Sequence, residues 1–243
     1  KSQVKIPDIV GECSDPALWE PFKQKAQEIK DSGSLFMAFM PTGVFERLHF
    51  LMGFEDMLMN FLSTHDTERI LTRLAGEDVG WHDREWQAER YLSPEQYVYG
   101  LSLLKCAMVL QFFLPGVPCI YYGDEAGLEG YKDPFNRRCY PWGKENKELI
   151  EWHKKLADVR KSCSALWDGD FINVLSEERR ISYIRHDKDS AIFCTFNLYD
   201  YEVEAKMPPG YADGKPVFGS KLENGILTIP PMSAEFVVLE LGI

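Results

Sequence analysis

The chain has 243 residues, of which 45% are hydrophobic and 27% are charged, as in an ordinary soluble globular protein. Its 38 acidic residues outnumber its 27 Lys and Arg residues, so the formal net charge is -11. Nucleic acids and anionic membranes attract positively charged surfaces, so this balance argues against both as partners and leaves neutral ligands open. The sequence has no apolar run of about 18 residues, so we expect no membrane-spanning helix.

The cysteines are scattered along the chain without the CxxC spacing that is typical of metal sites. We therefore expect no metal cluster and no cofactor, and we interpret most of the cysteines as small core residues. The first residues, Lys1 to Ile6, lack the long apolar segment of a secretion signal. Together with the unpatterned thiols, this favours a reduced, cytoplasmic setting. The six are Cys13, Cys106, Cys119, Cys139, Cys163 and Cys194.

Residues 1–166 alternate short apolar runs with helical patterns, which is typical of βα units around a parallel sheet. A helical pattern over 21–31 follows the first run, and the charged, Trp-containing segment 77–92 is interpreted as an insertion or loop. The predicted strands are 6–10, 35–40, 58–62 and 117–122.

Two helices have clear sequence signals. Ser93, Pro94 and Gln96 predict a helix start with a capping box, and the helix should end before Pro115. Apolar residues recur at helical spacing from Leu149 to Cys163 and predict an amphipathic helix.

The pattern changes at about residue 167. Alternating apolar residues in 181–185 and 191–195 flank the polar turn 186–190, which predicts a hairpin, and further strands are expected at 226–229 and 235–241. We therefore divide the chain into an α/β part, residues 1–166, and a small all-β domain, residues 167–243.

Polar residues follow three of the predicted strands, as Glu12, as the pair His65–Asp66, and as the pair Asp124–Glu125. The carboxyl ends of parallel strands share one face, where ligands bind, so these groups should meet at one site. The alternative is that each is only a helix N-cap or a loop salt bridge.

Two segments within 57–142 carry a resemblance. "MNFLSTHDTERILT" and "GVPCIYYGDEAGLEGYKDPFNRRCYPW" closely resemble the α-amylase family of glycoside hydrolases, in its neopullulanase and cyclomaltodextrinase branch. "PDIVGECSDPALW" is a weaker match to the strand that bears the family's general acid. A complete (β/α)8 TIM barrel takes about 250 residues, and the α/β part has about 165. The resemblance thus implies the second half of a barrel, strands five to eight, followed by a C-terminal β-sandwich domain.

The resemblance also implies roles for the site residues. His65 would bond sugar hydroxyls, and Asp66 would be the auxiliary catalytic carboxylate that grips two ring hydroxyls as the ring flattens toward an oxocarbenium ion. Asp133 and Arg137 would hold sugars further along an α-glucan substrate.

Neighbouring residues have supporting roles in the same resemblance. Arg69 would form a salt bridge beside the site, unless it is a plain surface pair. Asp124 and Glu125 would shape the floor of the site, and Trp142 would pack beneath the loop, with sugar stacking as the alternative.

The catalytic pair of a retaining glycosidase is incomplete in this sequence. Glu12 is the positional candidate for the general acid, although Cys13 and Ser14 replace the expected neighbours and a plain surface Glu is the alternative. The family places its nucleophile in a Gly-x-Arg-x-Asp pattern, which this sequence does not contain.

We therefore expect a fragment of an enzyme that hydrolyses α-1,4 or α-1,6 bonds in maltooligosaccharides, cyclodextrins or pullulan, inactive alone. Calcium could bind the full-length protein, with no indication of a site in these residues. The alternative is a non-catalytic glucan-binding or interaction protein. A half-barrel leaves strand edges and apolar surface open, so we expect a homo-oligomer or a missing N-terminal barrel half.

Overall fold

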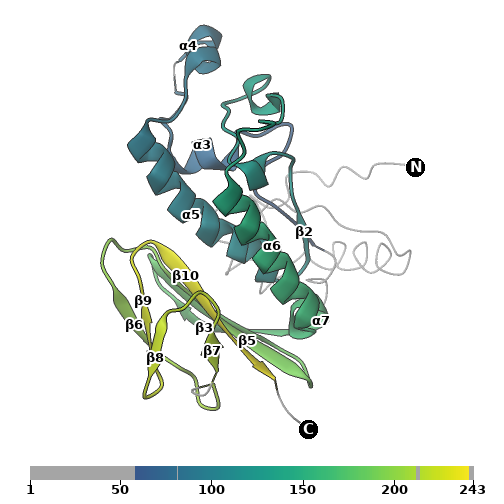
Figure 1. The fold of residues 1–243 in the computed structure, drawn as a ribbon, viewed down its shortest axis with the longest axis vertical. Coiled ribbons are helices and arrows are strands. Elements are labelled where there is room, and N and C mark those ends of the chain that lie inside the picture. Colours follow the sequence, from purple (N-terminus) through teal and green to yellow (C-terminus); the bar gives the residue numbers. More distant parts are fainter. Residues whose placement is uncertain (1–57, 81, 212–213, 241–243) are drawn as a thin grey trace, which may run out of the picture.

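A computed structural model of the protein describes residues 58–80, 82–211 and 214–240 (Figure 1). The predicted strands and helix before residue 58, and Glu12 with them, lie outside the described residues. In Figure 1 the helices and β2 form one part of the molecule, and strands β3 to β10 form a second part below them. The α-helices are α3 (Ile70–Ala75), α4 (Arg84–Glu89), α5 (Pro94–Phe113), α6 (Lys147–Ser162) and α7 (Ala165–Asp168).

Strands β1 (Met59–Phe61) and β2 (Val117–Cys119) pair in parallel, with Met59 opposite Val117. This parallel pairing was expected from the βα pattern, but in the described part of the chain the sheet has two strands and does not close into a barrel. The predicted strand 117–122 ends early, because its pairing with β1 stops at Cys119; the chain then turns at Gly123, whose φ is 89°.

Segment 77–92 is more ordered than the sequence suggested, because it contains α4. Asp83 caps this helix by accepting a hydrogen bond from the Trp86 backbone N–H at 2.9 Å. The Trp86 ring stacks on His82, with the ring centroids 3.7 Å apart. The alternative of a plain loop is therefore wrong, and the alternative of an insertion stays a prediction.

The long helix α5 begins as the sequence predicted. The Ser93 Oγ accepts from the Gln96 N–H at 3.2 Å, and the Gln96 side chain accepts from the Ser93 N–H at 2.9 Å. The helix ends at Phe113, before Pro115. Helix α6 likewise covers the predicted amphipathic segment, with Asn146 as its N-cap.

Replacing Ser93 with Ala should lower the free energy of unfolding by about 1 kcal/mol, because the Gln96 backbone N–H at the start of α5 loses its acceptor. Ser102 lies within the same helix and makes only a 3.5 Å bond to Val98, so Ser102→Ala is the matched control and should change stability little. Urea unfolding followed by circular dichroism measures both, and an equal effect of the two changes would contradict the capping assignment.

The C-terminal strands form two antiparallel sheets, in the orders β3-β4-β5-β10-β7 and β6-β9-β8. The predicted hairpin is confirmed, because β4 and β5 pair on either side of the turn 187–189. Buried residues of both sheets, among them Phe193 and Leu227, form one apolar cluster, as in a sandwich. The strands are β3 (Asp170–Ser176), β4 (Arg180–His186), β5 (Ser190–Asn197), β6 (Val203–Lys206), β7 (Lys215–Pro216), β8 (Lys221–Glu223), β9 (Ile226–Ile229) and β10 (Ser233–Glu240).

A larger core joins the helices to the five-stranded sheet. Phe113 of α5 packs edge-on against Phe236 of β10, with ring centroids 4.8 Å apart. Arg185 of β4 is buried and donates to the backbone carbonyl of Phe113 at 3.2 Å. Burial of these apolar residues holds the β-strands against α5 and α6.

Two further expectations concern the cysteines, which were interpreted mostly as core residues, and the absence of a membrane-spanning helix. Cys106, Cys163 and Cys194 are buried, Cys119 is partly buried and Cys139 is exposed, and all five are free thiols. Within the described residues, no helix is both long and apolar enough to cross a membrane.

Candidate functional site

The turn after β1 carries the first two site residues. The Thr64 N–H donates to the Thr67 hydroxyl at 2.9 Å, and the Asp66 N–H donates to the Thr64 hydroxyl at 3.1 Å. The His65 Nε2 lies 3.2 Å from the Asp66 Oδ2, and the two side chains are 65% and 69% exposed. An imidazole and a carboxylate therefore stand side by side on an accessible surface.

The loop after β2 brings the second pair to the same place. Arg137 Nε lies 2.7 Å from Asp133 Oδ1 and also donates to the backbone carbonyl of His65 at 3.2 Å. Its Nη2 lies 3.9 Å from Asp66 Oδ1. Residues about 70 positions apart in the chain thus form one cluster of two carboxylates, a guanidinium and an imidazole, referred to below as the polar cluster.

Arg69 lies beneath this cluster and is fully buried. It forms an ion pair with Asp124, with Nη1 3.1 Å from Oδ1, and its guanidinium lies 4.2 Å from the ring centroid of Tyr121. Its Nε donates to the Asn136 carbonyl at 2.6 Å. The alternative of a plain surface pair is therefore wrong, because no part of the Arg69 side chain reaches solvent.

Asp124 opens a short 3-10 helix, η5 (Asp124–Ala126), and is also buried. Burial raises the pKa of Asp124 to about 6, although hydrogen bonding from Ser63 and the charge of Arg69 both lower it. The rise in the pKa of Asp124 caused by desolvation thus exceeds the lowering caused by Arg69 and Ser63.

The packing predicted for Trp142 is wrong, because its side chain is 81% exposed. It lies on a tight turn in which the Trp142 N–H donates to the Tyr140 carbonyl at 2.9 Å, and this turn directs the indole outward. The Tyr140 ring packs beside it at 4.5 Å between centroids. The alternative of sugar stacking stays a prediction.

Sequence reasoning missed Asn136, which lies in η6 (Phe135–Arg137) and is fully buried. Its side-chain nitrogen donates to the backbone carbonyls of Thr67 and His65, at 2.7 and 2.9 Å. The only signal in the sequence was its position between Asp133 and Arg137, because an isolated Asn in a loop does not reveal which carbonyls it will meet.

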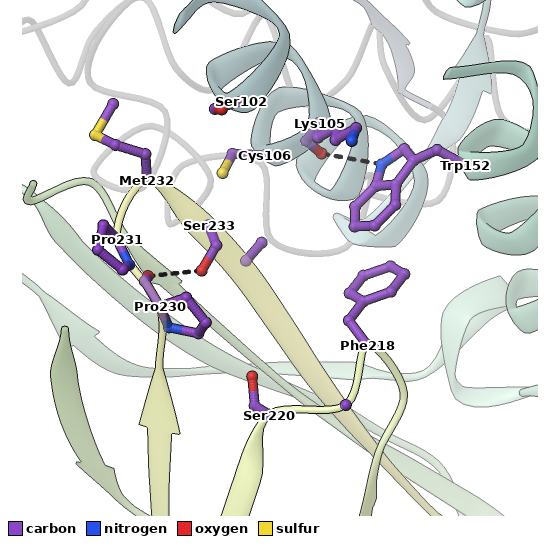
Figure 2. Close-up of a pocket in the computed structure, with 12 residues that line it drawn as sticks. Ser102, Lys105, Cys106, Trp152, Phe218, Ser220, Pro230, Pro231, Met232 and Ser233 are labelled. Atoms are coloured by element: carbon purple, nitrogen blue, oxygen red, sulfur yellow. Dashed lines mark hydrogen bonds between the residues drawn. The ribbon is translucent and has the colours of Figure 1, made fainter. Parts of the chain in front are cut away.

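A cavity of about 360 Å3 lies elsewhere, between α5, α6 and the β-strands (Figure 2). Its lining includes Ser102, Lys105, Trp152 and Met232, and none of the described residues around it contributes a carboxylate. Figure 2 shows the Trp152 indole nitrogen donating to the Lys105 carbonyl, at 3.3 Å. Glycosidases need carboxyl groups at the scissile bond, so this cavity does not have the groups for that chemistry.

The polar cluster itself suits a neutral, hydroxyl-rich ligand. Ionised carboxylates form short, strong hydrogen bonds with hydroxyl groups, and a guanidinium or imidazole supplies donors. The residues that the structure describes contain no group of three His, Cys, Asp or Glu side chains that could hold a metal ion.

Comparison with known proteins decides the family. The family model for the α-amylase catalytic domain matches residues 46–170, which include the whole polar cluster. The chain belongs to the α-amylase family.

Relatives within the α-amylase family include two enzymes of the genus Thermoanaerobacter. The amylopullulanase of Thermoanaerobacter thermohydrosulfuricus is 43% identical over 112 residues, which are 46% of this chain and 7% of that protein. The cyclomaltodextrinase of Thermoanaerobacter pseudethanolicus is 28% identical over 210 residues, which are 82% of this chain and 33% of that protein. The chain therefore spans a third or less of the length of these relatives.

Solved α-amylase structures share the fold. An α-amylase from Anoxybacillus matches 92% of this chain and 46% of its own, with a TM-score of 0.63 and 22% identity. The cyclic α-maltosyl-(1→6)-maltose hydrolase of Arthrobacter globiformis matches 82% of this chain and 38% of its own, with a TM-score of 0.60 and 24% identity. At these identities the likeness concerns the fold alone, and it is consistent with part of an α-amylase barrel.

Proposed function

We propose that this chain supplies the glucan-gripping part of a retaining glycoside hydrolase that acts on α-1,4 or α-1,6 glucosidic bonds. One observation carries the proposal: the exposed His65–Asp66 pair, 3.2 Å apart, lies against the Asp133–Arg137 pair. Within the α-amylase family, such a cluster suits the binding of sugar hydroxyls from two sides.

Each residue of the cluster has a distinct part in the proposed reaction. Asp66 accepts hydrogen bonds from two hydroxyls of the sugar ring and holds them more tightly as the ring flattens, so it favours the transition state over the bound substrate. His65 donates a further bond to a neighbouring hydroxyl. Arg137, held by Asp133, orients the next sugar along the chain.

The remaining catalytic groups are also proposals. Glu12 would be the general acid, protonating the leaving oxygen, and the nucleophile would come from a strand with the Gly-x-Arg-x-Asp pattern that this sequence lacks. We propose strands five to eight of the barrel for this chain. The names of its relatives, cyclomaltodextrinase and amylopullulanase, support cyclodextrins and pullulan as substrates.

The open sheet supports association with another polypeptide. Val117, Ile120 and Tyr122 are exposed apolar residues in and after β2, which has β1 as its only neighbour among the described strands. A strand edge that is unpaired among the described strands, with exposed apolar side chains, favours pairing, so we propose a front barrel half or a second copy as the partner. A cytoplasmic location stays a prediction.

Binding and activity measured separately test the proposed function. Isothermal titration calorimetry should detect binding of maltohexaose and maltoheptaose by the chain and no binding of cellohexaose, the β-linked counterpart of maltohexaose. The chain alone should release no reducing sugar from maltoheptaose, and mixing it with the front half of the barrel should restore release. The absence of any α-glucan binding would contradict the proposal.

A second candidate is a non-catalytic glucan-binding or interaction protein of the same family, which would need the sugar contacts of the polar cluster and no nucleophile. The same pair of assays separates the two functions. Maltoheptaose binding with no sugar release in any mixture would support this second candidate and contradict the hydrolase.

A further inference from the structure

Asn136 joins the two loops that carry the polar cluster. Its buried side-chain nitrogen donates to the carbonyls of Thr67 at 2.7 Å and His65 at 2.9 Å, with the Thr64 carbonyl at 3.4 Å. A flipped amide would turn its oxygen toward these three acceptors, so the hydrogen-bond network fixes the orientation of the side chain.

The same loop contacts the turn a second time. The His65 carbonyl accepts from both Asn136 and the Nε of Arg137, the latter at 3.2 Å. In the other direction, the Asn136 carbonyl accepts from the buried Arg69 at 2.6 Å. The turn that presents His65 and Asp66 is thus held by two consecutive residues, the buried Asn136 and Arg137, which is itself a member of the polar cluster.

We propose that Asn136 is a positioning residue for glucan binding, which sets the turn 64–67 against the Asp133–Arg137 pair. This proposal rests on the proposed function of the polar cluster. Asn136 is fully buried, so it acts through His65 and Asp66 and touches no sugar. Without its amide, the Thr67 carbonyl loses its bond to Asn136 and the His65 carbonyl keeps only its bond to Arg137. The turn then relaxes, and the two halves of the cluster no longer face one ligand.

The chain offers a matched control in Asn197. This residue is equally buried, and its side-chain nitrogen also donates to three backbone carbonyls, those of Tyr201 at 2.8 Å, Pro230 at 2.9 Å and Ile229 at 3.2 Å. It belongs to β5 of the sandwich, and none of its three partners lies in the polar cluster. The Asn197 oxygen also accepts from the Tyr199 N–H at 3.0 Å, so Asn197→Ala should lower stability at least as much as Asn136→Ala and yet leave binding unaffected.

Calorimetric titration with maltoheptaose, at a temperature where circular dichroism shows both variants folded, makes the comparison. Asn136→Ala should weaken binding at least about tenfold, whereas Asn197→Ala should bind within about twofold of the unchanged chain. Asn136→Ser retains one donor, so its loss of affinity should lie between those of Asn136→Ala and Asn197→Ala. This variant replaces Asn136→Ala in the comparison if the Ala variant does not fold. Equal affinities for Asn136→Ala and the unchanged chain, or equal losses in both Ala variants, would overturn the proposal.

Hydrogen exchange provides a readout that needs no sugar. Amides of the turn 64–67 should exchange faster in Asn136→Ala and not in Asn197→Ala. Unchanged exchange in the turn would overturn the positioning role. If the unchanged chain binds no maltoheptaose, the proposed function fails, and exchange still decides whether Asn136 fixes the turn.

Discussion

Replacing Asp66 with Asn should weaken maltoheptaose binding about 10- to 150-fold, which corresponds to the loss of about 1.5–3 kcal/mol for hydrogen bonds to a charged group. The amide keeps the size of the side chain but loses the charge and one of the two acceptor oxygens. Turnover restored by a front barrel half should fall by at least about 100-fold, because the Asp66 contacts strengthen in the transition state. Calorimetry and reducing-sugar release measure the two effects.

Asp200 provides the control for the change of charge, because it is an exposed aspartate beyond the end of β5. Asp200→Asn alters the net charge by the same amount and should leave both binding and turnover unchanged. Turnover by Asp66→Asn at the level of the unchanged protein would remove Asp66 from the mechanism.

Local signals in the sequence predicted several elements well. The capping box at Ser93 and the hairpin around 187–189 involve residues close together in the chain, so their patterns contain the physical cause. The strand that begins at Val117 was predicted too long, because its apolar run continues to Tyr122, whereas pairing with β1 ends at Cys119. Apolar pattern alone cannot place the end of a strand whose following turn is also apolar.

The candidate site was also predicted where local patterns and the family resemblance sufficed, and missed where distant contacts decide. The position of His65 and Asp66 after an apolar run, and the family resemblance, selected the residues that the structure brings together with Arg137. The sequence could not show that Arg69 is buried or that Trp142 is exposed, because both depend on contacts with distant loops. Asn136 was missed for the same reason, since its three acceptors lie about 70 residues away in the chain.

Arg69→Met should cause the largest loss of stability, about 3–5 kcal/mol, because it leaves the buried carboxylate of Asp124 without its partner. Met fills much of the same space, so the cost reflects the lost charge more than a cavity. Urea unfolding at pH 8 measures the change. The double variant Arg69→Met with Asp124→Asn removes both charges and should be more stable than Arg69→Met alone.

The pH dependence identifies the buried charge as the cause. The pKa of Asp124 in the folded chain is about 6, above its ordinary value of 3.8. Protonation of this carboxyl therefore stabilises the folded state at low pH, and that stabilisation is lost as the pH rises through 6. At pH 5 the Asp124 carboxyl is mostly protonated in the unchanged protein and in Arg69→Met, so the substitution no longer leaves a buried negative charge without a cation beside it. The destabilisation by Arg69→Met should therefore be largest at pH 8 and smaller at pH 5. A loss of stability that is the same at both pH values would mean that Arg69 acts through its packing on Tyr121 and its bond to Asn136, and not through Asp124.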